Sequence, residues 1–194
     1  MSAPAQDHRE LMAAAIERDG AGQRALFAGD IDAARAAFAQ AADLYRRSWE
    51  SAPPGSYGRL VGMLKSAVLA GGGEAEAAYA REALGGDDRP SPAAAYALAI
   101  AALIGGDDAA ARRFSEAMRP GLEAFVRAAD AVDALAAGDQ DAYDAALGAI
   151  VRDFEQRAEH LTGVPIADTA LMLQRLAEPR GMAARIGSPV LPPV

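Results

Sequence analysis

The sequence predicts an all-α protein whose antiparallel helical hairpins stack as a short right-handed superhelix. A joint made of Gly, an acid, two variable positions and a small residue recurs at Gly29, Gly73, Gly106 and Gly138. The intervals are 44, 33 and 32 residues, and near-constant spacing in this range is typical of stacked helical hairpins. Hydrophobic residues make up 52% of the chain, and many are Ala, the best helix former. Aromatic residues are only 6%, which argues against an extensive sheet.

The joints at 29–30, 73–74, 106–107 and 138–139 have a physical interpretation. The Gly adopts the left-handed backbone conformation that ends one helix. The acid caps the following helix and favours its positive end. Each joint therefore predicts a turn between two antiparallel helices.

The first hairpin is expected over residues 5–50. An apolar stripe indicates a helix over 5–19, and Gly20 and Gly22 weaken or break it before a short segment at 23–28. The second helix begins at Asp30 and runs to about residue 50. Its apolar residues fall on one face: Ile31, Ala34, Phe38, Ala41 and Tyr45.

Small and aromatic residues of this hairpin fall at the spacings of a tetratricopeptide-type repeat. They are Ala21, Gly22, Ala25, Gly29, Asp30, Ala34, Phe38 and Ala41. The hairpin therefore resembles that family, and the resemblance implies that these residues pack the first helix of a pair against the second. The later hairpins share the turns of this pattern.

The segment 51–58 interrupts the helical pattern, because Pro53, Pro54 and Gly55 cannot continue a helix. This insertion explains the longer first interval between joints. Loops of this kind often carry function. Helices follow over 59–70 and 74–84, separated by three glycines.

The helix at 93–104 is almost wholly apolar and is therefore expected at the centre of the stack. A loop at 85–88 precedes it, Ser91 caps it, and Pro92 occupies its first position. A helix over 109–118 packs back on it through Phe114. Pro120 then opens a helix that runs to residue 137, with Leu122 among its inward-facing residues.

The C-terminal part is expected to hold two helices. Asp139 caps a long helix that runs to about His160, so that Asp153, Arg157 and His160 share one face. The last helix, 168–177, covers the open end of the array. Residues 1–187 then form a single helical-repeat domain, and the Pro-rich tail, 188–194, is extended.

Composition and charge exclude several classes of protein. The net charge is −8, and a uniformly acidic surface repels phosphate backbones, so we expect no nucleic-acid partner. The chain has no Cys and hence no disulfide or thiolate metal site. The longest apolar run, 93–104, is shorter than the ~20 residues of a membrane span. The polar N-terminus lacks the apolar core of a signal peptide. We expect a cytoplasmic protein without cofactor or membrane partner.

Clusters of acidic residues near the joints are better explained by helix capping than by cation binding. They lack the alternating oxygen ligands and distal Glu of a calcium loop. The clusters are Asp30/Asp32, Asp87/Asp88, Asp107/Asp108 and Asp139/Asp141.

Five side chains are candidates for contact with a partner: Trp49, Tyr57, Arg59, Lys65 and His160. Trp is favoured at interfaces, although packing behind the Pro-Pro loop is the preferred interpretation of Trp49. Lys65 either pairs with a buried acid or extends its stem to water, and the second alternative is preferred. His160 with Asp168 is a candidate metal site or general base. An ordinary position near a helix C-terminus explains His160 better.

Three stretches together resemble the immunity protein 49 family of bacterial polymorphic-toxin systems. The resemblance implies a helical-repeat protein that binds and neutralises a cognate toxin. The stretches run from 48 through 57–59 to 71, from 168 to 182, and from 188 to 192.

The leading functional hypothesis is a non-enzymatic protein-binding module with a groove for a peptide or partner helix. In the immunity version, an acidic protein faces a basic toxin. The alternative is a small-ligand binder or an enzyme with its site in the groove near His160 and Asp168. A third hypothesis is a homodimer formed through an exposed helix face.

Overall fold

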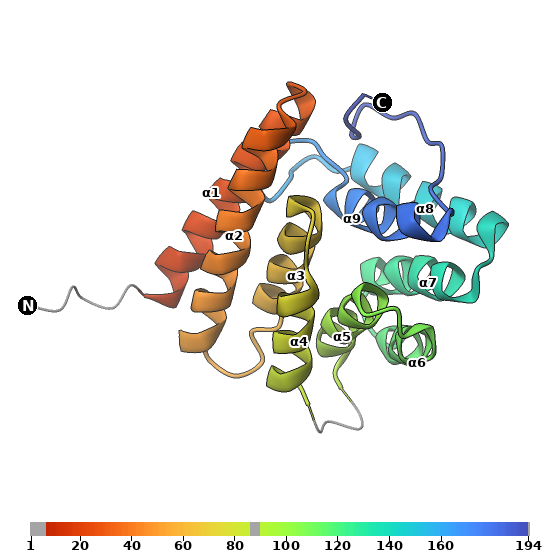
Figure 1. Cartoon of the computed structure of the whole chain (residues 1–194), viewed down its shortest axis with the longest axis horizontal. Helices are drawn as coiled ribbons and strands as arrows, with labels where there is room; N and C mark the ends of the chain where they lie inside the picture. Colours follow the sequence, from red (N-terminus) through yellow and green to blue (C-terminus); the bar gives the residue numbers. More distant parts are fainter. Residues whose placement is uncertain (1–6, 86–89, 194) are drawn as a thin grey trace, which may run out of the picture.

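The structure, a computed structural model, describes residues 7–85 and 90–193. These residues form nine α-helices and one short 3-10 helix, with no strand among them, which confirms the all-α prediction. Consecutive helices pack against each other (Figure 1). The elements are α1 (His8–Phe27), α2 (Ile31–Ser51), α3 (Gly58–Ala70), α4 (Glu74–Ala83), α5 (Pro92–Ile104), α6 (Asp108–Met118), α7 (Glu123–Ala137), α8 (Gln140–Glu155), α9 (Asp168–Ala177) and η1 (Glu178–Arg180).

The first helix is continuous through Gly20 and Gly22, so of the two expected effects, a weakened or a broken helix, the break is wrong. A Cβ atom on Gly22 would lie 2.9 Å from the ring of Phe38 on α2. Gly20 in turn lies against Thr162. The two glycines make room for neighbouring residues and do not end the helix. The predicted start of this helix at residue 5 lies outside the described residues.

Three of the four joints cap a helix as predicted. The Asp side chain accepts a hydrogen bond from the backbone N–H three residues later at 3.0 Å, in the pairs Asp30–Ala33, Asp107–Ala110 and Asp139–Ala142. The joint at 73–74 differs, because Gly73 is itself the N-cap, with φ of 128°, and Glu74 is already helical. The acid at that joint acts only as a favourable charge in the first turn.

The core is centred on α5, as the sequence predicted. Its residues 94–103 are all buried, and the helix contacts α3, α4, α6 and α7. The Ser91 hydroxyl oxygen caps the helix by accepting a hydrogen bond from the Ala94 N–H, and Pro92 is the first residue of the helix. The loop predicted at 85–88 lies mostly outside the described residues, and so does the acidic pair Asp87/Asp88.

The seventh helix begins at Glu123, not at Pro120. Residues 118–121 form a turn closed by a 3.0 Å hydrogen bond from the Gly121 N–H to the Met118 carbonyl. A Cβ on Gly121 would lie 2.7 Å from Pro92, so this turn is in tight contact with the start of α5. Leu122, predicted to face inward, is therefore the N-cap of α7 and is 75% exposed.

The eighth helix ends at Glu155, and the predicted extension to His160 is wrong. The chain leaves the helix axis and runs back toward α1, where the Thr162 hydroxyl donates to the Gln23 side chain. Val164 and Ile166 of this connection are buried. The free energy gained by burying these side chains is larger than that gained by extending α8 into solvent.

The last helix has the bounds that the sequence predicts, but it contacts α3 as well as α7 and α8. It thus lies between the early and late helices, as Figure 1 shows, and does not only cover one end. After η1 the chain runs back over this region, and the Val190 carbonyl accepts a 2.8 Å hydrogen bond from the Ala167 N–H. Among the described residues, no helix has the length and apolar character that crossing a bilayer requires.

Candidate functional site

The candidate residues predicted from the sequence lie in two separate places. Trp49, Tyr57 and Arg59 surround the connection between α2 and α3. Lys65 and His160 line one cavity together with Asp168, and we call it the polar cavity.

The group at the connection makes mainly internal contacts. The half-buried Trp49 packs against the core, and its ring lies 5.9 Å from that of Tyr57. The Arg59 guanidinium donates to the Ser48 hydroxyl at 2.7 Å and lies 3.0 Å from Nδ1 of His8. Arg59 thus links the start of α3 to His8 on α1, and Trp49 packs against the core, as the packing interpretation of Trp49 expects.

The cavity has a volume of about 260 Å³ and lies among α1, α2, α3, the connection from α8 to α9, and the start of α9. Apolar side chains form part of its wall, and polar ones converge from every element around it. The polar lining residues include Asp19, Gln23, Tyr45, Lys65, Arg157, His160, Thr162, Asp168 and Thr169.

Lys65 pairs with a carboxylate. Its ammonium lies 2.6 Å from Oδ2 of Asp168 and 3.2 Å from the hydroxyl of Thr169, and its side chain is 17% exposed. The preferred sequence interpretation, a stem extended to water, is therefore wrong, and the alternative of an acid partner is right. Burial lowers the pKa of Lys65, but Asp168 and the other acidic groups nearby outweigh it and raise the pKa. The side chain is a stable cation.

Asp19 is the charged residue of this cavity that sequence reasoning missed. Its two carboxylate oxygens accept hydrogen bonds from the hydroxyls of Ser66 at 2.7 Å and Tyr45 at 2.8 Å. Burial raises the pKa of Asp19 to about 6, against the lowering effect of these hydrogen bonds and of Lys65. A signal was present, because Asp19 follows the buried Leu11 and Ala15 at helical spacing and so stands in the apolar stripe.

His160 stands in the connection after α8. Its ring stacks on that of Phe154 with centroids 6.2 Å apart, and its Nδ1 is buried without a hydrogen-bond partner in the described structure. The Arg157 guanidinium lies 3.7 Å from the centre of the same Phe154 ring and pairs with Asp153 at 2.5 Å. Asp153 and Arg157 thus pair as predicted, although they do not share a helical face with His160.

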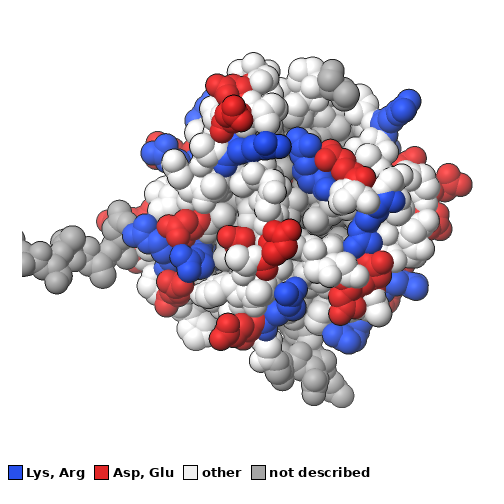
Figure 2. All heavy atoms as spheres, in the orientation of Figure 1, with Lys and Arg blue, Asp and Glu red and all other residues white. Residues whose placement is uncertain are grey.

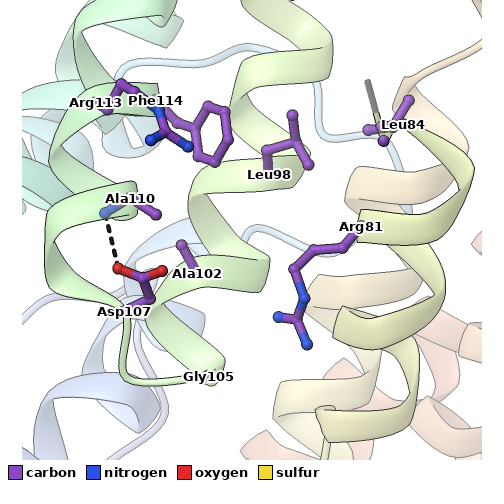
Figure 3. Close-up of a pocket in the computed structure, with 10 residues that line it drawn as sticks. Arg81, Leu84, Leu98, Ala102, Gly105, Asp107, Ala110, Arg113 and Phe114 are labelled. Carbon is purple, nitrogen blue, oxygen red and sulfur yellow. Dashed lines mark hydrogen bonds between the residues drawn. The ribbon is translucent and has the colours of Figure 1, made fainter. Parts of the chain in front are cut away.

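A second, larger hollow lies between α4 and α6, with α5 as its floor (Figure 3). Its volume is about 670 Å³. Leu98 and Ala102 form the floor, Arg81 and Leu84 one side, and Arg113 and Phe114 the other. We call this hollow the α4–α6 groove. The sequence does not predict this groove, because its floor belongs to the buried core helix α5 and its sides belong to two other helices.

The two arginines of the α4–α6 groove have no carboxylate partner among the described residues. Arg81 donates to the backbone carbonyl of Ala101 at 3.0 Å, and the Arg113 guanidinium lies 4.8 Å from the ring centre of Phe114. The one acid in the lining, Asp107, caps α6. On the face shown in Figure 2, acidic and basic side chains are interspersed.

Across residues 7–85 and 90–193, no group of three or more acidic or His side chains is placed to hold a metal ion. The polar cavity can therefore offer hydrogen bonds and charge, and the α4–α6 groove can offer apolar surface between two cations. No protein-family model, curated protein or solved structure matches the chain.

Proposed function

We propose that the protein is a non-enzymatic, cytoplasmic protein-binding module of the helical-repeat type, and that the α4–α6 groove is its binding face. The observation that carries the proposal is an open hollow of about 670 Å³ running between two helices over the apolar floor of a third. A groove of this kind suits a partner helix that lays its apolar face between two helices.

The charges of the α4–α6 groove define the partner. Arg81 and Arg113 lie on opposite sides of an apolar floor. Guanidinium groups favour carboxylates, to which they can donate two hydrogen bonds at once. The partner segment is therefore an amphipathic helix whose apolar residues are flanked by acidic ones.

The finer architecture is part of the proposal. We infer that the hairpins follow the tetratricopeptide arrangement and form a short right-handed superhelix. The close contact of Gly22 with Phe38, and three identical Asp caps at the joints, support this inference.

A more specific version is a toxin-neutralising immunity protein. The resemblance to the immunity protein 49 family and the net charge of −8 support it, and it calls for a basic toxin drawn by electrostatic steering. The α4–α6 groove calls for acidic side chains on the partner segment. An acidic segment bound to this protein would therefore indicate contact through the α4–α6 groove, whereas a basic one would indicate attraction by the acidic surface as a whole.

The main proposal is tested by immobilising the protein and its variants and comparing the partner proteins that each retains from a lysate of the source cells. The charge-reversed variant Arg81→Glu/Arg113→Glu is compared with Arg18→Glu/Arg185→Glu, which changes the charge equally at exposed positions outside the groove. A partner retained by the wild type and the second variant, but lost by the first, supports the proposal. Equal capture by both variants would contradict the assignment of the groove.

The second candidate function is a small-ligand binder, and a specific observation favours it. Lys65, His160 and Asp168 line one cavity, together with Asp19. Convergence of polar groups and a carboxyl of perturbed pKa is typical of ligand sites. Screening of metabolites and metal ions by thermal shift tests this candidate, because a ligand that binds the folded protein raises its melting temperature.

A further inference from the structure

The polar cavity holds one carboxylate that contacts no cation. Lys65 is paired with Asp168 at 2.6 Å. Arg157 is paired with Asp153, which also binds Arg127. Asp19, in contrast, accepts hydrogen bonds only from two neutral hydroxyls within the part of the chain that the structure describes.

Among the charged groups nearest Asp19, one negative charge is in excess at neutral pH. Arg157 and Arg127 are balanced by Asp153 and Glu123. The charged groups that face Asp19 are Lys65 from α3 and Asp168 from α9, and these two cancel. Burial and the nearby Asp19 raise the pKa of Tyr45 on α2 above the ordinary value for Tyr, so this side chain is neutral at neutral pH. Asp19 is half-buried, and a partly desolvated charge without a counter-ion is costly, so a bound cation would stabilise this site.

The rest of the cavity suits a small organic ligand. Met12, Val61, Val164 and Ile166 supply apolar wall. His160 contributes its imidazole ring to the lining as a further polar group. A volume of about 260 Å³ is slightly below the lower end of the range of drug-sized pockets. These features favour a short aliphatic ligand with one charged end and a second polar group.

We propose that this cavity binds a small primary amine, whose ammonium group pairs with the carboxylate of Asp19 while a hydroxyl or similar polar group reaches His160. The inference rests on the second candidate function, that the cavity is a ligand site. It adds the chemical class of the ligand and the residue that selects it.

The proposal predicts how amine affinity depends on pH. Asp19 must be ionised to bind an ammonium group, and the pKa of Asp19 is raised to about 6. Simple alkylamines remain charged throughout the range from pH 5 to 8, because the pKa of an alkylammonium is close to that of Lys. The affinity for the amine is therefore nearly constant above pH 7. Below pH 6 it decreases with pH, and the decrease approaches tenfold for each pH unit.

The test uses the full chain and four probes of similar size: ethanolamine, propylamine, ethylene glycol and propionate. Binding is followed at pH 7.5 by amide chemical shifts in two-dimensional NMR spectra. The variant Asp19→Asn is compared with Glu17→Gln, which removes the same charge from an exposed position of the same helix. The amide spectra also report whether each variant keeps the wild-type fold.

We expect both amines to shift the amides around Asp19, His160 and Thr162. Asp19→Asn should weaken the binding at least tenfold, and Glu17→Gln should leave it within twofold. If Asp19→Asn fails to fold, the loss of amine affinity of the wild type below pH 6 takes its place as the decisive measurement.

The outcomes separate the inference from the candidate function on which it rests. Binding of propionate or ethylene glycol as tight as that of the amines would overturn the amine assignment and keep the cavity as a ligand site. Amine binding unchanged in Asp19→Asn, or unchanged between pH 7 and 5, would overturn the role of Asp19. If no probe shifts the amides around the cavity at about 50 mM, a concentration high enough to detect millimolar binding, the inference is overturned. A ligand found by thermal shift would still keep the cavity as a ligand site.

Discussion

The ammonium of Lys65 on α3 lies 2.6 Å from a carboxylate oxygen of Asp168, the first residue of α9. Both side chains are mostly buried, at 17% and 27% exposure. The desolvation of two charges offsets much of their attraction, so such a pair adds little net stability. We infer that the pair favours the observed placement of α9, because a placement that separates the two side chains while they stay buried leaves a charge unpaired.

The first prediction concerns loss of one partner of this pair. Lys65→Met should lower the free energy of unfolding by about 2 to 3 kcal/mol, because it leaves Asp168 without its counter-ion. Lys65→Met with Asp168→Leu should cost less than the single change. Urea unfolding monitored by circular dichroism measures both. The control is Arg112→Met in the exposed pair with Asp133, which should cost under about 1 kcal/mol. Equal losses in Lys65→Met and Arg112→Met would contradict the prediction.

The second prediction concerns the pH dependence that Asp19 gives to stability. The pKa of this carboxyl is raised to about 6 by burial, from an ordinary value of 3.8. Between these two values the folded state binds more protons than the unfolded state, so the contribution of Asp19 to stability falls as pH rises through this window. Relative to the wild type, Asp19→Asn should therefore gain about 2 to 3 kcal/mol between pH 4 and pH 7. Denaturant unfolding at both pH values measures it, and a parallel pH dependence in the two proteins would count against it.

Much of the fold could be predicted from local signals. Chain turns and helix starts follow from Gly, Asp and Ser-Pro, since capping and turn formation depend on a few neighbouring residues. The prediction was wrong where contacts between distant segments decide. From the sequence, Gly22 is expected to break the helix, because the ring of Phe38 that lies against it cannot be foreseen. Likewise, α8 is expected to be longer, because the sequence does not show that the chain beyond Gln156 returns to α1.

In the candidate site, too, local features could be predicted from the sequence and contacts between distant segments could not. Lys65, His160 and Asp168 stand out in the sequence as polar groups in unusual settings, and all three line the polar cavity. The pairing of Lys65 with Asp168 was not predictable, because these two residues are brought together only by the docking of α9 on α3. Asp19 was detectable from its place in the apolar stripe of α1, whereas the α4–α6 groove required the packing of three helices.

The third prediction concerns the joints between helices. Asp107→Ala should lower the free energy of unfolding by about 1 kcal/mol, because it removes a 3.0 Å hydrogen bond to an otherwise unpaired N–H at the start of α6. Glu74→Ala should cost only about 0.3 kcal/mol, since that side chain caps nothing and acts through the helix dipole alone. The two variants are matched, because each removes one acid at a joint. A cost for Glu74→Ala as large as that for Asp107→Ala, measured by urea unfolding, would show that the joints act alike.

The fourth prediction concerns two glycines that face rings on α2. A Cβ on Gly22 would lie 2.9 Å from the Phe38 ring, and one on Gly62 would lie 2.8 Å from the Tyr45 ring. Ala is favoured over Gly within a helix by about 1 kcal/mol, but crowding in a packed core costs about 1 to 3 kcal/mol. Both Gly→Ala variants should therefore be destabilised, and Gly62→Ala by more. The reason is that Tyr45 is held by its hydrogen bond to Asp19 and its ring cannot easily retreat.

Gly148 on α8 supplies the matched control for these variants. A Cβ there would approach only the terminal nitrogen of the exposed Arg152 side chain, at 3.3 Å, and that flexible group can move away. Gly148→Ala should thus raise the free energy of unfolding by about 0.5 to 1 kcal/mol, with thermal and urea unfolding as the measurements.

A smaller side chain in place of the Phe38 ring gives a second comparison. Gly22→Ala combined with Phe38→Leu should cost less than the sum of the two single changes, because the space that Leu leaves accepts the new methyl group. Additive costs would mean that Gly22 is required for a reason other than the close approach of Phe38.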